Sequence, residues 1–327
     1  MKTHFTEKTL LTAVLAATCI AALPLNVQAA WPEKPIQLIV PFGPGGANDL
    51  MGRVAATGLS KQLGQPVIIE NKPGAGAIIG ADYVAKAKPD GYTFLVGAAG
   101  VVTNSVLRTT MPYADSDLIP VGMIAVAPSV IVVRPEFPAN NLKELAAHAK
   151  SKGKEGLTFA TAGSGSTPHF VEEMLKEATG AQFVVVPFKS GQEGVNSVIG
   201  NTVDITSEAS IVVLPQIKAG RLKALATTYQ KRITAYNSLP TAIEQGFTGV
   251  SIGHWAGLFA PKGTPPEIVE KMSKELQHVM TSKESVDRLV PSGIEPAPGS
   301  TADFTGFLNQ ERTRLGALAK KANMKAD

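Results

Sequence analysis

The hydrophobic pattern after residue 30 alternates between short apolar runs and amphipathic stretches. The apolar runs have the length and β-branched content of buried strands, and they cover 36–40, 67–70, 92–96, 131–133, 157–160, 183–186 and 203–206. Between them, apolar residues recur at helical spacing over 50–63, 78–87, 142–150, 168–179 and 193–199. This alternation predicts an α/β fold with mainly parallel sheets that are flanked by helices.

Two β-rich segments, 130–134 and 222–228, lie beside turn residues and are interpreted as crossings between two lobes. One lobe is then continuous over 130–228, and the other is assembled from 30–129 and 229–327. Two connections between α/β lobes are typical of a hinge with a ligand cleft. The sequence therefore predicts a two-lobed fold of the periplasmic binding protein type.

The first 29 residues have the features of an export signal. Lys2 and Lys8 make a basic start, an apolar stretch covers 10–25, and Val27-Gln28-Ala29 supplies small residues for cleavage after Ala29. The remaining 298 residues suit two domains. Cys19, the only cysteine, lies in the leader, so no disulfide and no catalytic thiol are expected in the mature chain. The predicted location is the periplasm.

Charge and histidine spacing argue against several classes of function. The net charge of +4 falls to +3 when Lys2, Lys8 and Glu7 leave with the leader, and no basic cluster suggests nucleic acid. No later apolar run is long enough for a membrane segment. The mature histidines show no metal-ligand spacing, and neither a metal nor a cofactor is expected; they are His148, His169, His254 and His278.

Three glycine-rich loops, 42–49, 71–76 and 161–167, join a predicted strand to a predicted helix. A helix start carries unpaired N–H groups and partial positive charge, and glycine removes the Cβ that would keep a ligand away. Such a loop can hold a carboxylate or a phosphate without an arginine. Because ligands bind at the carboxyl ends of strands in open α/β sheets, the first and third loops are interpreted as two anion cradles rather than simple turns.

Nucleotide and hydrolase motifs are incomplete. A third glycine is missing at positions 48 and 79, and no loop carries the Walker lysine. Ser164 lacks the flanking glycines of a nucleophile elbow. An exported hydrolase would have to use Ser166, His169 and Asp204, but two of these lie three residues apart at one helix start, which does not align a nucleophile with a base. No catalytic residue is predicted.

Several longer motifs carry a family resemblance from Trp31 to nearly the C-terminus. They are "WPEKPIQLIVPFGPGGANDLMGR", "LGQPVIIENKPGAG", "AKAKPDGYTFLVG", "AGSGSTPH", "VPFKSGQEGVNSVIGNTVDI", "IKAGRLKALATT" and "WAGLFAPKGTP". They resemble the substrate-binding receptors of tripartite tricarboxylate transporters, called Bug receptors. The resemblance implies a periplasmic receptor, expected to be a monomer, that closes around a small organic acid and delivers it to a permease of two other subunits.

The resemblance also implies which residues line the cleft. On the first lobe they are Phe42, Pro44, Gly45, Gly46, Ala47, Asp49 and Asn104, and on the second Ala162, Gly163, Ser164, Ser166, Thr167, His169 and, near the closing edge, Asp204. Two of these have alternative interpretations: Asp49 as a first-turn acid paired with Arg53, and His169 as a capping or packing side chain. The loop composition predicts binding by amides, hydroxyls and water, without an arginine clamp.

The ligand is expected to be a dicarboxylate, because each of the two cradles can take one carboxylate. An aromatic diacid such as a phthalate isomer is one option, since the small loop residues leave room. Ser207 and Glu208 stand where the family pattern is expected to be more apolar, which leaves the size and polarity of the ligand open. A receptor that reports ligand occupancy to a membrane signalling partner is the alternative function.

Overall fold

The computed structural model describes residues 31–326, and the predicted export signal with its cleavage after Ala29 lies outside them. The chain divides into two units, 1–33 and 34–327. Of the first unit the structure describes only residues 31–33, which include a cis peptide bond between Trp31 and Pro32.

Three parallel strands form one end of the sheet: β1 (Ile36–Val40), β2 (Val67–Asn71) and β3 (Thr93–Gly97). β1 lies between the other two, with Ile36 opposite Val67 and Gln37 opposite Thr93. The connections are α2 (Ala47–Leu63), the 3-10 turn η1 (Ala75–Ala77) and α3 (Ile78–Ala85). Gly64 ends α2 in the left-handed conformation, with φ of 66°, which glycine adopts without a steric penalty.

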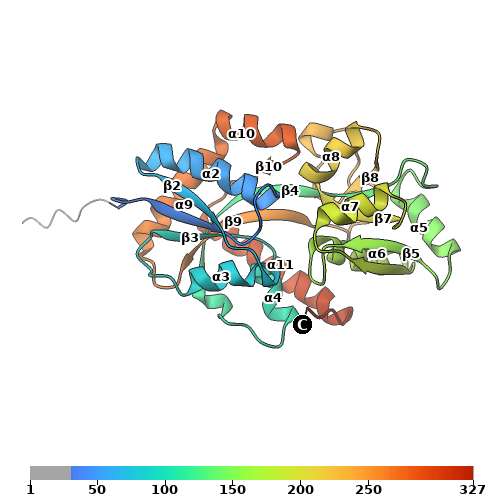
Figure 1. Ribbon diagram of the computed structural model, residues 1–327, viewed down its shortest axis with the longest axis horizontal. Helices are drawn as coiled ribbons and strands as arrows, with labels where there is room; N and C mark the ends of the chain where they lie inside the picture. Colours follow the sequence, from blue (N-terminus) through green and yellow to red (C-terminus); the bar gives the residue numbers. More distant parts are fainter. Residues whose placement is uncertain (1–30, 327) are drawn as a thin grey trace, which may run out of the picture. The chain divides into compact units, whose positions relative to one another are not determined.

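Three further parallel strands form the other end: β5 (Leu157–Thr161), β6 (Phe183–Pro187) and β7 (Ile205–Ala209). They are connected by α6 (Thr167–Thr179) and α7 (Gly191–Ile199), while α5 (Leu142–Ser151) precedes them and α8 (Ser210–Lys218) and β8 (Lys223–Thr227) follow. In Figure 1 this group lies to the right and β1, β2 and β3 lie to the left. Below, the two ends are called the β1 side and the β5 side.

Two long antiparallel strands, β4 (Leu118–Val133) and β9 (Gly253–Pro261), join the two sides. β3 pairs with β9, and β9 pairs with β4 as far as Pro128, opposite Gly253. From Ser129 onward β4 pairs instead with β7 and β8. The strand order is therefore β2-β1-β3-β9-β4-β7-β5-β6, and the pairs are parallel only toward its ends.

The remaining elements are mostly helical. They are α4 (Gly100–Leu107), η2 (Asp115–Asp117), η3 (Thr234–Tyr236), α9 (Pro266–Thr281), α10 (Lys283–Leu289), η4 (Val290–Ser292), β10 (Glu295–Pro296) and α11 (Thr301–Lys321). α11 takes part in two apolar cores. Phe304 and Leu308 pack with Trp255 on the β1 side, whereas Leu315 and Ala319 belong to the core of the β5 side.

Most predicted elements before residue 228 are confirmed to within three residues at each end. Two elements differ from the prediction. β4 begins at Leu118 rather than at Ile131, because its apolar run continues through Pro120, Gly122 and Pro128, and register shifts beside Gly122 keep it paired. α6 begins at Thr167 with Ser166 as its N-cap, one residue earlier than expected.

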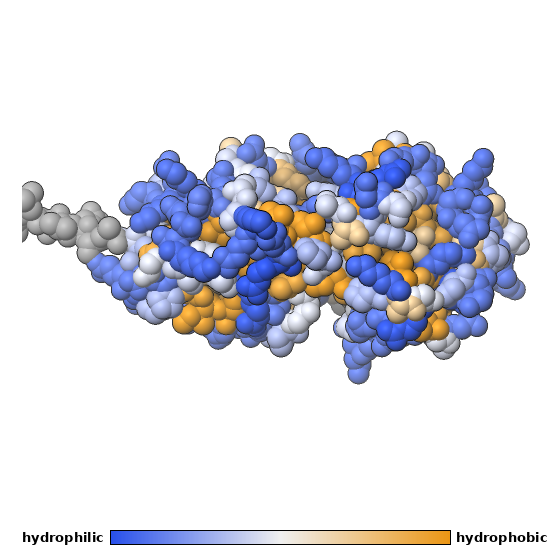
Figure 2. Space-filling view, turned by 90° about the horizontal axis from the view of Figure 1, so that it is seen from above, coloured by the Kyte–Doolittle hydropathy of each residue, from blue (hydrophilic) through white to orange (hydrophobic). Residues whose placement is uncertain are grey.

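The surface facing the viewer in Figure 2 is largely polar, and its apolar residues form separate patches. None of the helices in residues 31–326 combines the length and apolar content that a membrane crossing requires.

Candidate ligand-binding site

The strand register brings the two predicted glycine loops to facing edges. On the β1 side, Gly97 at the carboxyl end of β3 pairs with Gly257, and β9 starts at this edge. On the β5 side, Ala209 at the carboxyl end of β7 pairs with Ser129. Pro128, which pairs with the start of β9, is the residue before Ser129. The carboxyl edges of the two sides therefore meet where β4 crosses, and the loops 41–46 and 162–166 both lie at this meeting.

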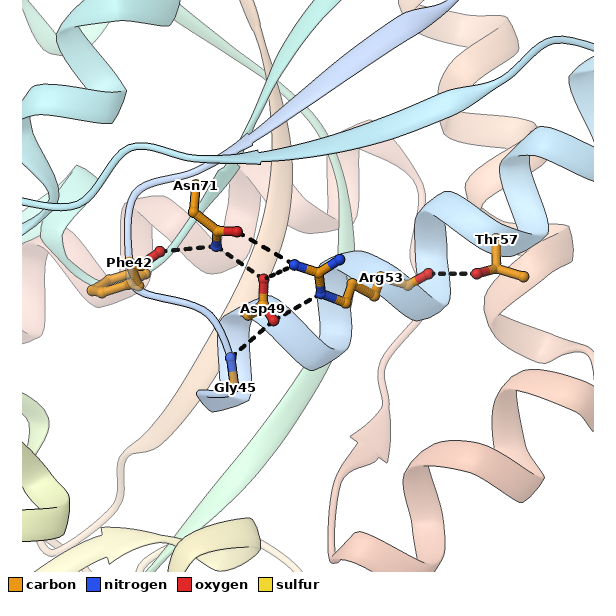
Figure 3. Close-up of polar contacts among 6 residues, drawn as sticks. All are labelled: Phe42, Gly45, Asp49, Arg53, Thr57 and Asn71. Carbon is orange, nitrogen blue, oxygen red and sulfur yellow. Dashed lines mark hydrogen bonds and ion pairs between the residues drawn. The ribbon is translucent and has the colours of Figure 1, made fainter.

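Asp49 organises the first loop from inside. Its carboxylate is 3% exposed and accepts hydrogen bonds from Gly45 N (3.0 Å), Arg53 Nε (2.8 Å) and Nη2 (3.0 Å), and Asn71 Nδ2 (2.9 Å) (Figure 3). Burial raises the pKa of Asp49, but the bonds from Arg53, Gly45 and Asn71 outweigh it and lower the pKa below its ordinary value. The local Asp–Arg pair is confirmed, and these contacts occupy the carboxylate.

The second loop is closed in the same way. Gly165 N donates to His169 Nδ1 at 3.1 Å, and Gly45 and Gly165 both have positive φ (88° and 76°). His169 and Asp49 are each the third residue of their helix. Burial lowers the pKa of His169, which favours the neutral ring that this bond requires. The structure therefore supports the packing interpretation of His169 at neutral pH.

The helices behind these loops start without a cap. Four other helices, α5, α7, α10 and α11, are capped by the side chains of Asn141, Ser190, Ser282 and Ser300. No described side chain accepts a hydrogen bond from the first turn of α2 or of α6, because the N-cap of α2 is Gly46 and the Ser166 hydroxyl donates to Gly163 O at 2.7 Å. Main-chain amides at Ala47, Asn48 and Thr167 are thus available to an anion at the meeting of the two edges.

The other predicted residues divide by position. Phe42, Pro44, Gly45, Gly46 and Ala47 belong to the first loop, and Ala162, Gly163, Ser164, Ser166 and Thr167 to the second. Asn104, buried on α4, donates to Gly76 O at 3.0 Å and so supports the loop after β2. Asp204 is separate from all of them: it accepts from Thr158 N and Oγ1 at the amino-terminal edge of β5, opposite the loops.

The carboxyl-terminal segment touches the second loop. The Ser164 hydroxyl donates to Lys325 O, and Ala326 N donates to Leu107 O at 3.0 Å at the end of α4. A Cβ on Gly165 would collide with Leu107 Cδ1. This segment therefore connects the loop of the β5 side with a helix of the β1 side.

Four polar residues at the meeting of the edges were not predicted as part of the site. Asn71 holds Asp49, and Asn48 Nδ2 donates to Trp255 O at 3.4 Å. Glu208, at the carboxyl end of β7, lies with Oε1 3.4 Å from His254 Nε2 on β9. Glu208 could have been singled out from the sequence as a charged residue at the end of a predicted strand. The contacts of Asn71 and His254 could not, because they depend on which strands pair.

A second group of titratable residues lies on α6. One ligand atom each of His169, Glu172 and Glu173 falls within 4.8 Å of the others. The spacing of the histidines alone does not indicate this group, since two of its members are glutamates. The Nδ1 lone pair of His169 is already used by Gly165 N, and Lys176 Nζ lies 3.2 Å from Glu173 and 3.4 Å from Glu172, so the lysine already supplies a cation to this group.

A surface hollow of about 830 Å³ lies elsewhere. Its lining includes Lys34, Gln37, Tyr92 and Thr93, at the amino ends of β1 and β3. Since the glycine loops follow the carboxyl ends, this hollow is not the candidate site.

Comparison with known proteins agrees with the geometry. The family model described as "Tripartite tricarboxylate transporter family receptor" matches residues 51–324. The chain belongs to this family. It is 36% identical over 296 residues to a UPF0065 protein of Bordetella pertussis (90% of this chain, 91% of that protein) and 33% identical over 315 residues to Protein BugT of the same organism (95% and 96%).

Solved structures of related receptors share the two-lobed periplasmic binding protein fold. The chain resembles the periplasmic binding protein BugD (TM-score 0.78, 34% identity, 90% of this chain and 99% of that one). It also resembles R. palustris Rpa4515 with adipate (TM-score 0.82, 33% identity, 90% of this chain and 99% of that one). A third similar structure is MatC from Rhodopseudomonas palustris with bound malate (TM-score 0.77, 28% identity, 88% of this chain and 99% of that one). The chain is therefore a periplasmic solute-binding receptor of this family, and such receptors are not enzymes.

Proposed function

We propose that this receptor binds a small dicarboxylate between the first turns of α2 and α6 and delivers it to a tripartite tricarboxylate-type transporter. The observation that supports this proposal is the pair of uncapped helix starts at facing carboxyl edges. Each start offers amides and the positive end of a helix to one carboxylate. Adipate and malate, the ligands of two similar receptors, are both dicarboxylates.

The lobe boundaries that we propose follow β4. One lobe would cover 130–228 and the other the rest of the mature chain, since the strand changes partner between Pro128 and Ser129. We extend the first of these lobes by the segment up to Ile252, because Ala242, Val250 and Ile252 pack in the core of the β5 side. We propose that the mature receptor is a monomer whose lobes close on the ligand.

A ligand screen tests the proposed function. Refolded protein, stripped of any bound ligand, is scanned for thermal stabilisation by mono-, di- and tricarboxylates, with phosphate and simple amines as comparison. A ligand at about 100 times its Kd adds roughly 2.7 kcal/mol to the free energy of unfolding, which raises Tm by a few degrees. Stabilisation by phosphate or amines, with no response to any carboxylate, would refute the proposal.

Gly46→Val tests the cradle itself. Gly46 has φ of −81° and no atom within 4 Å of the position of a Cβ, so valine fits the fold while its side chain covers the amides. We expect Tm without ligand to stay within about 2 °C and the affinity for the dicarboxylate to fall by about 100-fold or more, measured by calorimetric titration. Gly249→Val, at an exposed glycine with the same free space, is the matched control and should bind normally. Unchanged affinity in Gly46→Val would show that the loop is only a turn.

A further inference from the structure

Glu208 is a buried acid without a permanently charged partner. It is 6% exposed, and its Oε1 accepts from Ala209 N at 2.8 Å. The other acids buried in residues 31–326 each pair with a lysine or arginine on the same helix: Asp49 with Arg53, Glu172 with Lys176 and Glu311 with Arg314. The only ion-pair partner of Glu208 in this part of the chain is His254. Burial lowers the pKa of His254, although Glu208 opposes this, so the ring stays neutral near pH 7.

Glu208 is linked to both glycine loops through neighbouring residues of the sheet. Toward the first loop, its neighbour His254 precedes Trp255, whose carbonyl accepts from Asn48 in the first turn of α2. Toward the second loop, Ala160 of β5 pairs with Thr206 of β7, and this register places Ala162 level with Glu208. Glu208 therefore lies at the carboxyl edge at which the two loops meet.

The start of α7 packs directly against this carboxylate. A Cβ on Gly191 would collide with Glu208 Oε2, so the carboxylate lies over the first residue of α7. The positive end of a helix stabilises an anion there. Oε2 has no hydrogen-bond partner among the described residues, which leaves it available to a ligand.

We propose that Glu208 is a specificity residue, and that it selects a dicarboxylate that carries an ammonium group between its two carboxylates. An ammonium group would donate to Glu208 Oε2 while the amides of the two loops hold the carboxylates. A plain dianion would instead place its charges beside this carboxylate, which is unfavourable in a partly desolvated site. This inference rests on the function proposed above and adds the chemical class of the ligand.

Matched pairs of ligands test it by calorimetric titration at neutral pH. Succinate is compared with aspartate, and glutarate with glutamate, since the members of each pair share a carbon skeleton and differ in the amino group. In the unaltered receptor the amino acid should bind at least about tenfold more tightly than the plain diacid. Malate, which has a hydroxyl in place of the amine, should bind more weakly than aspartate. Equal or tighter binding of the plain diacids or of malate overturns the proposal.

Glu208→Gln should reduce the preference for the amino ligand by about tenfold or more, because the amide keeps the shape but loses the charge. Glu208→Asp, which keeps the charge on a shorter side chain, should retain part of the preference and shows whether a folding defect explains the first result. Glu177→Gln removes the same charge from an exposed pair with Lys321 and should leave the preference unchanged.

The outcomes separate this inference from the proposed function. If plain diacids bind and Glu208→Gln leaves the ratio within each pair unchanged, the receptor still binds dicarboxylates and the role of Glu208 is wrong. If neither diacids nor their amino analogues bind, the proposed function fails together with this inference.

Discussion

Asp49 combines burial, a lowered pKa and contacts with three separate residues, so its carboxylate holds the first loop in place. Gly45, Arg53 and Asn71 all donate to it. A carboxylate held in this way affects binding through the position of the loop amides. Its replacement should therefore change stability as well as affinity.

Asp49→Asn should lower the free energy of unfolding by about 1–3 kcal/mol at neutral pH, since the NH2 group that replaces Oδ2 cannot accept the bonds from Gly45 N and Arg53 Nε. The folded-state pKa is below its ordinary value, so the stabilisation by Asp49 is present above about pH 4 and is lost as the pH falls through the folded-state pKa. Urea unfolding at several pH values should show the wild type and the variant converging in acid. An equal difference at all pH values would contradict this account.

Single residues also show how far the sequence could predict the site. Arg53 was expected to pair with Asp49 because the two lie four residues apart on one helix, and it does. Asn71 could not be found in this way, because it reaches Asp49 only through the pairing of β1 with β2. Asp204 was placed near the closing edge of the cleft by the family resemblance, but it precedes β7, which starts at Ile205, and it lies at the opposite edge beside Thr158.

Helix α6 contains a buried glutamate, Glu172, whose carboxyl group is poorly satisfied. Glu172 is fully buried, neither of its oxygens has a hydrogen-bond partner among the described residues, and Lys176 Nζ is 3.4 Å away. Burial, together with the neighbouring Glu173, raises the pKa of Glu172 to about 8. Because the folded-state pKa is raised, the stabilisation by the protonated form is complete below about pH 4.5 and is lost as the pH rises toward 8.

Glu172→Gln should remove this loss, because glutamine stays neutral. We expect the variant to be more stable than the wild type by roughly 1–2 kcal/mol near pH 9, with a smaller difference near pH 6. Thermal unfolding across this pH range measures it. Glu177→Gln, an exposed acid on the same helix, is the control and should show no such trend. A variant that is less stable at high pH would show that the pair with Lys176 outweighs the cost of burying the charge.

The elements themselves were predicted well where periodicity was clear and poorly where it was not. Helices such as α5 and α6 have one apolar face, which gives a strong signal in the sequence. β4 is apolar on both faces because helices cover both, so its sequence lacks the alternation of a half-buried strand. It also contains prolines, which usually mark loops. The antiparallel pairing of β9 with β3 and β4 could not be predicted, since β9 lies more than 100 residues after both.

At the scale of the whole described unit, β4 and α11 each take part in both the β1 side and the β5 side. β4 is hydrogen-bonded on both sides, and α11 contributes Phe304 and Leu308 to one core and Leu315 and Ala319 to the other. When cores share elements in this way, neither can unfold while the other remains intact. The two sides should therefore behave as one cooperative unit.

Scanning calorimetry should accordingly show one transition, with equal calorimetric and van't Hoff enthalpies. Leu315→Ala, at a fully buried position of α11, should cost about 2–5 kcal/mol and lower the single Tm without splitting the transition. Val286→Ala, at an exposed position of α10, is the control and should have little effect. Two resolved transitions in the wild type would refute the coupling.

The contact between Lys325 and Ser164 has a practical consequence for handling this receptor. A group attached after Ala326 would begin close to the second loop, at one end of the proposed cleft, because Lys325 O accepts from the Ser164 hydroxyl. A bulky purification tag or a fluorescent reporter joined there would crowd that entrance. Reporter pairs for a biosensor are better inserted at Gly249, in an exposed turn whose glycine has open space around it.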